Sequence, residues 1–178
     1  MKVKQIHHVA YRCNDAQETV AFYRDVLGMD YLLAFAENEV PSTKEPDPYM
    51  HVFLDAGNDN VMAFFELPNS PQMSRDPNTP EWVQHIAFAL DTMEELNDAK
   101  AHLEGHGLDV LGPVDHGLFD SIYFFDPNGH RLEFAVDKGT TADRDRARAV
   151  ADEMLEEWSR TKRAPRQAAW LHEGTLNP

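Results

Sequence analysis

The sequence contains a single cysteine, Cys13, among 178 residues. One thiol forms no intrachain disulfide, and it excludes a zinc site built from several thiolates. Basic residues are also scarce, because 16 Lys and Arg stand against 31 Asp and Glu and give a formal net charge of −15. Polyanions repel a chain of this charge, so nucleic acids and anionic membranes are excluded as main partners.

Long apolar runs are absent as well. No stretch of about 18 apolar residues occurs, so we expect no segment that spans a bilayer. The first residues, MKVKQIHHVAYR, lack the apolar region and the cleavage site of a signal peptide, and we therefore expect a cytoplasmic protein. What the chain does have is 42% hydrophobic residues, enough to build a core, and nine histidines.

The acidity is confined to residues 1–140, which hold 9 basic and 24 acidic side chains, whereas residues 141–178 hold seven of each. This change predicts a globular body over 1–140 and a C-terminal helix and tail over 141–178. Thr140 or Thr141 can cap the helix, in which apolar residues recur at helical spacing. Those residues are Ala147, Val150, Ala151, Met154, Leu155 and Trp158. We expect the apolar stripe to pack on the body; a lid or a dimer arm is the alternative.

The body contains an internal repeat. Residues 6–12, IHHVAYR, resemble residues 83–89, VQHIAFA, and both have the composition of half-buried strands. A helix is predicted after each strand, beginning near Asp15 in the first copy and near Asp91 in the second. Three strand-like segments follow each helix. They cover residues 31–35, 51–54 and 61–67 in the first copy, and 109–111, 121–125 and 131–136 in the second.

The predicted fold is therefore α+β, with two paired βαβββ modules at about residues 4–68 and 81–138. Asp126–Gly129 is predicted as a tight turn between the last two strands. Proline-rich residues 37–49 and 68–80 are predicted as an inserted loop and as the link between the modules.

The repeat suggests a metal site. His8 and His85 occupy equivalent places on the first strands, and Glu66 and Glu133 lie near the ends of the last strands. A pseudo-twofold arrangement of the modules would bring these four side chains together. Two imidazoles with one or two carboxylates suit a borderline divalent ion, namely zinc, nickel, iron(II) or manganese. Each glutamate has a simpler explanation, since a carboxylate in an apolar strand also pairs with an arginine such as Arg12 or Arg131.

The body resembles the vicinal oxygen chelate superfamily, which includes glyoxalase I, extradiol dioxygenases and bleomycin resistance proteins. The resemblance rests on four segments and covers residues 6–137. The segments are His8-Val-Ala-Tyr, Phe22-Tyr-Arg-Asp-Val-Leu-Gly-Met, His85-Ile-Ala-Phe and Asp126-Pro-Asn-Gly-His-Arg-Leu-Glu. It implies that the paired modules form a metal-binding cup, closed within one chain or between two chains, and that the protein forms a homodimer and binds a small-molecule substrate.

One part of the resemblance favours extradiol ring cleavage. Val114-Asp-His116, followed by Ile122-Tyr123, Asp126-Pro, Gly129 and Glu133, is similar to the signature of these dioxygenases. It implies that His116 and Tyr123 act beside a metal held by His8, His85 and Glu133. Iron(II) is then the favoured metal, with nickel(II), zinc(II) or manganese(II) as alternatives, and the expected substrate is a catechol or a related aromatic.

Glu66 points to a different reaction. It aligns with the additional carboxylate ligand of glyoxalase I-like members, in which a carboxylate acts as a base beside the metal. Asn60 or Asp59 also stands near the place where many extradiol enzymes carry an acid–base histidine, and asparagine does not shuttle a proton as imidazole does. A glyoxalase I-like lyase or isomerase is therefore the alternative function. A binding or resistance protein without catalysis is the third, and retention of all four ligand-type residues argues against it.

Overall fold

The computed structural model describes residues 2–172, which form two compact units. Unit 1 takes the chain up to His85 together with Phe125–Arg131, and unit 2 takes Ile86–Phe124 and the chain from Leu132 onward. The described residues form two sheets of four strands each. No helix in this part of the chain is long and apolar enough to cross a membrane.

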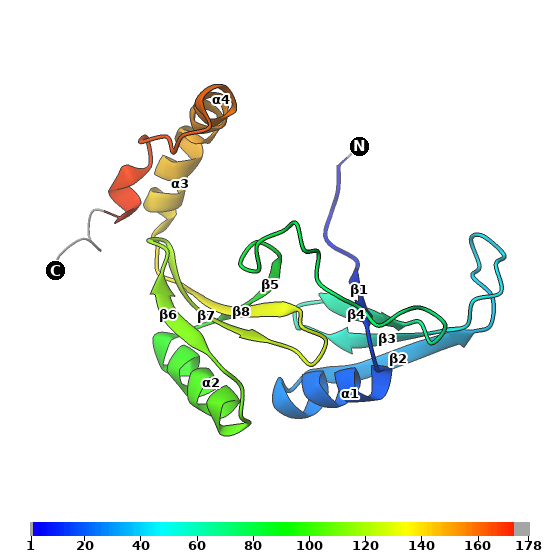
Figure 1. The fold of residues 1–178 in the computed structure, drawn as a ribbon. Coiled ribbons are helices and arrows are strands. Elements are labelled where there is room, and N and C mark those ends of the chain that lie inside the picture. Colours follow the sequence, from blue (N-terminus) through cyan, green and yellow to red (C-terminus); the bar gives the residue numbers. More distant parts are fainter. Residues whose placement is uncertain (1, 173–178) are drawn as a thin grey trace. The chain divides into compact units, whose positions relative to one another are not determined.

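Unit 1 carries the first module (Figure 1). Its elements are β1 (Val9–Cys13), α1 (Ala16–Ala21), a π-helical turn η1 (Phe22–Val26), β2 (Asp30–Glu37), β3 (Tyr49–Asp55) and β4 (Val61–Glu66). The strand order is β1-β4-β3-β2, with β1 parallel to β4 and the other pairs antiparallel. Asp15 caps α1 as predicted, because its side chain accepts a hydrogen bond from the Glu18 backbone N–H.

One face of the first sheet is covered by α1. Val20 and Tyr23 belong to the helical segment, and they are buried together with Leu54 and Phe64 of the sheet. The Tyr23 and Phe64 rings lie 4.9 Å apart between centroids. The opposite face of this sheet therefore remains for other contacts.

Unit 2 contains most of the second module. Its elements are β5 (His85–Leu90), α2 (Met93–Gly105), β6 (Leu111–Asp115), β7 (Phe119–Phe125) and β8 (Arg131–Asp137), and the strand order is β5-β8-β7-β6. This order repeats that of the first sheet, which confirms the predicted pair of βαβββ modules. Leu96 and Leu103 of α2 are fully buried, as are Ile122, Phe124 and Leu132 of the sheet that α2 covers (Figure 1).

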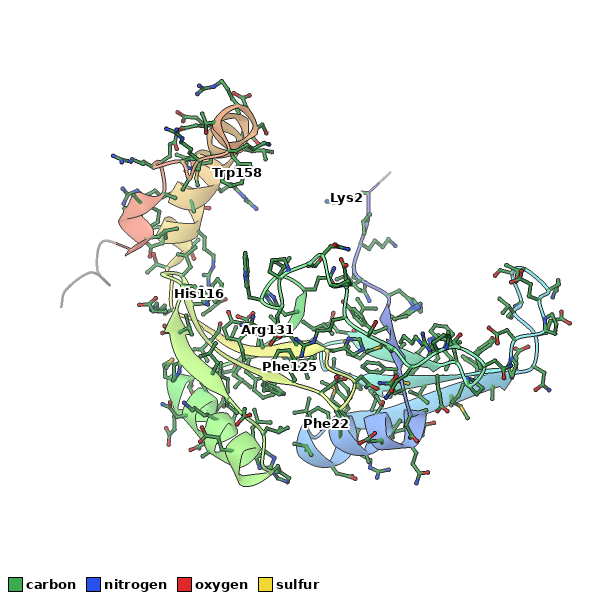
Figure 2. All side chains as sticks on the ribbon, viewed as in Figure 1. Lys2, Phe22, His116, Phe125, Arg131 and Trp158 are labelled. Carbon is green, nitrogen blue, oxygen red and sulfur yellow. The ribbon has the colours of Figure 1, made fainter. Side chains whose placement is uncertain are left out.

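The C-terminal extension is helical, as predicted, but it forms two helices, α3 (Thr141–Ala149) and α4 (Ala151–Thr161), and a short 3-10 turn, η2 (Ala169–His172). Thr140 caps α3 in a capping box with Asp143. The apolar side chains of α4 are not covered within unit 2, because Leu155 is 64% exposed and Trp158 is 47% exposed. Trp158 is labelled on this helix in Figure 2.

The turn between β7 and β8 belongs to unit 1 and is held by a buried polar network. Asp126 is 5% exposed, and its carboxylate accepts hydrogen bonds from the Tyr23 hydroxyl at 3.1 Å and from the backbone N–H groups of Asn128 and His130. The Asn128 side chain donates to Thr19 Oγ1 at 3.0 Å and accepts from the Asn14 backbone N–H at 2.8 Å. The predicted Asp126–Gly129 turn is therefore present and is also anchored by its side chains.

Candidate functional site

His8 lies immediately before β1, on the face of the first sheet that is turned away from α1. The side chain is exposed, and its Nδ1 lies 2.8 Å from Nδ1 of His7. Its ring centroid is 6.0 Å from that of Phe53 and 6.4 Å from that of His51. Because β1 is an edge strand, the predicted ligand His8 stands at the border of an aromatic surface formed by β3.

Glu66 lies at the other end of the β1–β4 ladder. Val9 pairs with Met62 and Cys13 pairs with Glu66, so Glu66 is about five residues, or roughly 16 Å, along the ladder from the level of His8. Cross-strand partners share a face, and Cys13 is buried on the α1 side at 1% exposure. Glu66 Oε2 accepts a hydrogen bond from the Ala16 backbone N–H at 2.7 Å. Within unit 1, the structure therefore does not bring Glu66 and His8 together.

His85 is the first residue of β5, an edge strand of the second sheet. It is exposed, and its Nδ1 lies 3.2 Å from the Val83 carbonyl oxygen. Nδ1 donates in this contact, because a carbonyl only accepts, and Nε2 is then the nitrogen that carries the lone pair. A ring fixed in this tautomer presents the nitrogen type that ligates metals.

Glu133 is a buried carboxylate in the middle strand β8 of unit 2. It is 2% exposed, and its Oε1 accepts a short hydrogen bond from the hydroxyl of Ser121, which is itself fully buried. Burying a carboxylate is costly unless it is paired or coordinates a metal. The hydrogen bond from Ser121 is one such partner for the Glu133 carboxylate.

His116 and Tyr123 contact each other. The Tyr123 hydroxyl lies 2.8 Å from His116 Nε2, and the His116 ring stacks on Phe119 with centroids 4.9 Å apart. His116 follows β6 at the loop before β7 (Figure 2). Tyr123 is two residues along β7 from Ser121, so both side chains lie on one face, and the bond from Ser121 places Glu133 on that face as well.

His51 lies on the face of the first sheet that is turned away from α1, although the sequence predicted no role for it. Its ring stacks on Phe65 at 3.6 Å between centroids and with an interplanar angle of 18°, and its Nε2 is buried without a hydrogen-bond partner among the described residues. Burial, and then the nearby His8, lower the pKa of His51 below its usual value. The alternation of His51 and Phe53 along β3 was the available signal, since residues two apart share a face.

The candidate ligands are side chains of the types that bind a divalent ion. Two exposed imidazoles, one just before β1 and one at the start of β5, and one buried carboxylate are the ligand types that iron, zinc and nickel sites use. The unpartnered nitrogen of His51 beside His8 is a polar atom of the kind that a bound group satisfies. Within residues 2–172, no three His, Cys, Asp or Glu side chains lie close enough together to hold a metal ion by themselves.

Comparison with known proteins agrees with the module architecture. The family model described as Glyoxalase/Bleomycin resistance protein/Dioxygenase superfamily matches residues 5–134. Biphenyl-2,3-diol 1,2-dioxygenase 3 of Rhodococcus globerulus is 27% identical over 137 residues, which are 77% of this chain and 65% of that protein. This chain thus spans slightly less than two thirds of that dioxygenase.

Two other similar proteins are matched over nearly their whole length. Lactoylglutathione lyase of Haemophilus influenzae is 30% identical over 136 residues, which are 76% of this chain and 95% of the lyase. The crystal structure of the glyoxalase family protein from Enterococcus faecalis aligns with a TM-score of 0.55 and 27% identity over 74% of this chain and 97% of that one. With its two βαβββ modules and a family match over most of its length, this chain belongs to the glyoxalase/bleomycin resistance protein/dioxygenase superfamily.

Proposed function

We propose that this chain is a metal-dependent ring-cleaving dioxygenase of the extradiol type, which acts on a catechol or a related aromatic. The observation that carries the proposal is the 2.8 Å contact between Tyr123 and His116, on the face of β7 and β8 that bears the buried Glu133. The similarity to a protein named as a biphenyl-2,3-diol dioxygenase supports the same chemistry.

His8, His85 and Glu133 are the proposed ligands of an iron(II) ion. When bound, this ion would supply a point of chelation for both oxygens of a catecholate and a place for dioxygen to react. One carboxylate leaves the set with a net positive charge, whereas a second would cancel it and weaken the attraction for a dianion. The hydrogen bond from Ala16 to Glu66, and the α1 side on which Glu66 lies, support a ligand set without Glu66.

Tyr123 and His116 are the proposed proton-handling pair. The phenol donates to Nε2 when a neutral imidazole carries its proton on Nδ1, and it accepts from Nε2–H when the proton is on Nε2, which leaves the phenolic hydrogen for a substrate oxygen. A pair of this kind donates a hydrogen bond to negative charge that develops on a substrate oxygen. Tyr123 is 9% exposed, so this interaction takes place where water competes little.

The direct test is oxygen consumption. Protein loaded anaerobically with iron(II) and mixed with a panel of catechols in air should consume oxygen and form a yellow ring-cleavage product. Tyr123→Phe should lower kcat by about 10²–10⁴-fold, the usual contribution of a positioned proton donor. Tyr11→Phe is the matched control, because Tyr11 is 39% exposed on β1 and has no proposed role. Silence across the panel, or equal effects of the two variants, would refute the proposal.

A glyoxalase I-like lyase is the second candidate function. The similarity to lactoylglutathione lyase over 95% of that protein favours it, and Glu66 would then act as a ligand or a base. Turnover of a hemithioacetal with nickel or zinc, without oxygen uptake, would establish this reaction instead. Glu66→Gln distinguishes the two mechanisms, because loss of a base costs orders of magnitude in rate, whereas the glutamine carbonyl oxygen still accepts from the Ala16 N–H and a purely structural role would leave turnover nearly unchanged. Glu94→Gln on α2 is the surface control.

A further inference from the structure

The C-terminal end of α2 carries two histidines that lie side by side. His102 belongs to the last turn of the helix and His106 is its C-cap, so the two residues are four positions apart and share one face. Their ring centroids are 4.4 Å apart, with an interplanar angle of 52°. Both side chains are exposed, so ions in solution reach them.

The backbone of α2 holds this pair in place. The His106 backbone N–H donates to the His102 carbonyl oxygen at 3.2 Å, which continues the helical hydrogen bonding as far as His106. Gly107, with a φ of 80°, ends the helix directly afterwards. Leu103, between the two histidines, is fully buried and fixes the other side of the helix. The two imidazoles therefore project from a packed helix and not from a loop.

A hydrogen bond of its side chain sets the tautomer of His106. Nδ1 lies 2.9 Å from the His102 carbonyl oxygen, and Nδ1 donates because a carbonyl only accepts. Nε2 then carries the lone pair of the neutral imidazole, which is the form that ligates metals. The same bond caps a terminal carbonyl of α2, but capping uses Nδ1 and not Nε2.

The ring spacing and the local charge both suit a divalent ion. Two imidazoles bound to one tetrahedral zinc ion, at zinc–nitrogen distances of about 2.0–2.1 Å, have ring centroids roughly 5 Å apart. The observed 4.4 Å reaches this value by small side-chain rotations. Residues Met93–Gly105 carry four carboxylates and one lysine, and the carbonyls at the C-terminus of α2 form the negative end of its dipole. A cation is therefore attracted to this end of the helix.

We propose that His102 and His106 chelate a zinc, nickel(II) or copper(II) ion, with water completing its coordination. Imidazole nitrogens select these ions over magnesium and calcium, which prefer oxygen ligands. Two protein ligands suffice because the second imidazole binds intramolecularly. The site is separate from Glu133, since α2 covers the face of the second sheet that carries Ile122, whereas the bond from Ser121 places Glu133 on the opposite face.

Calorimetry on the full chain tests this site after a chelator has removed bound metal. Zinc titrated into wild type and into His85→Ala, which lacks one ligand of the other proposed metal site, should in both cases bind in an event of one ion per chain. In the His85→Ala background, His102→Gln and His106→Gln should each weaken that event at least about tenfold, because each leaves a single imidazole. Asn97→Gln is the matched control, since it places the same side chain on the exposed part of α2 and should leave the affinity unchanged.

Thermal unfolding gives a second readout on the same proteins. Zinc should raise the melting temperature of the His85→Ala protein, because the unfolded chain does not hold the two rings together. The increase should be smaller in His102→Gln and His106→Gln. Without zinc, these variants should melt close to their parent, which shows that they are folded.

The outcomes decide between this site and its rivals. Absence of a zinc event in the His85→Ala protein, or an event that survives both histidine substitutions, would overturn the site. An effect of His102→Gln or of His106→Gln alone would overturn chelation by the pair. One ion per two chains would overturn coordination by water in favour of an ion shared by two copies. None of these results depends on oxygen uptake from a catechol, so the site stands or falls independently of the proposed dioxygenase.

Discussion

Ser121→Ala tests whether Glu133 is held as a charged group. Ser121 is fully buried, Glu133 is 2% exposed, and the serine hydroxyl donates to Glu133 Oε1. A hydrogen bond to a charged group contributes about 1.5–3 kcal/mol, roughly twice the value for a neutral pair. The substitution removes one oxygen atom and little volume, so almost all of its effect comes from the carboxylate. We therefore expect the free energy of unfolding to fall by about 2 kcal/mol.

The measurement is a double-mutant cycle by urea unfolding. Ser121→Ala is compared in the wild-type background and in Glu133→Leu, in which no acceptor remains opposite the serine. The substitution should cost about 2 kcal/mol in the first background and less than about 0.5 kcal/mol in the second. Equal costs in both backgrounds would refute the reasoning, because the loss would then come from packing around residue 121.

The same variant has a second readout if Glu133 binds the metal. Groups that hydrogen bond to a ligand orient it, and their loss typically weakens metal affinity 10–100-fold. Competition with a chelator measures that affinity directly and independently of turnover. A loss of stability without a loss of metal affinity would show that Glu133 serves the fold of unit 2 alone.

Three further predictions concern the fold. Asn128→Ala should lower the free energy of unfolding by about 2–3 kcal/mol in urea, because it removes several partly buried hydrogen bonds of about 1 kcal/mol each. The control Asn97→Ala, on the exposed face of α2, should change it by less than about 0.5 kcal/mol. Burial raises the pKa of the Cys13 thiol from 9.0 to about 11, so at pH 8 a disulfide reagent should modify it about 100-fold more slowly in native than in urea-unfolded protein; equal rates would contradict its burial. Gly112→Ala should lower the free energy of unfolding by about 2 kcal/mol or more, because φ is 112° and a Cβ would lie 2.6 Å from a backbone oxygen of β7. The control Gly105→Ala, at the end of α2, places a Cβ with nothing within 4 Å and should be neutral or slightly stabilising in thermal melts.

The fold was predictable because its signals are local. Alternating apolar residues, capping residues such as Asp15 and Thr140, and the turn at Asp126–Gly129 each act within a few residues of chain. The break between α3 and α4 at Val150 was not predicted, since the apolar spacing continues through it without proline or glycine. The exposed stripe of α4 was also not predicted, because spacing indicates a face and does not say what covers it.

The site was predictable only in part, because strand register is not local. Overlaying the repeat aligned His8 with His85, and it suggested that Glu66 would come near His8. The alignment compares positions along the chain, whereas the distance between His8 and Glu66 depends on how β1 pairs with β4. That pairing joins residues more than 50 positions apart, and shifting it would move Glu66 along the sheet or to its other face. The aromatic surroundings of His51 were not predicted for the same reason, since its neighbours in space come from β2 and β4.

The segment from His116 to Glu133 contains residues with two different roles. His116, Tyr123 and Glu133 lie in unit 2, where they form the hydrogen-bonded pair and the buried carboxylate of the proposed site. Asp126 and Asn128 lie in unit 1 and make none of these contacts; they bind the turn to the helical segment through Tyr23 and Thr19. One sequence pattern therefore combines residues for proton handling with residues for anchoring a turn. Substitutions in the second group should reduce stability without changing the proton-handling pair, whereas Tyr123→Phe should reduce turnover and lower stability by only about 1 kcal/mol, the value of one hydrogen bond.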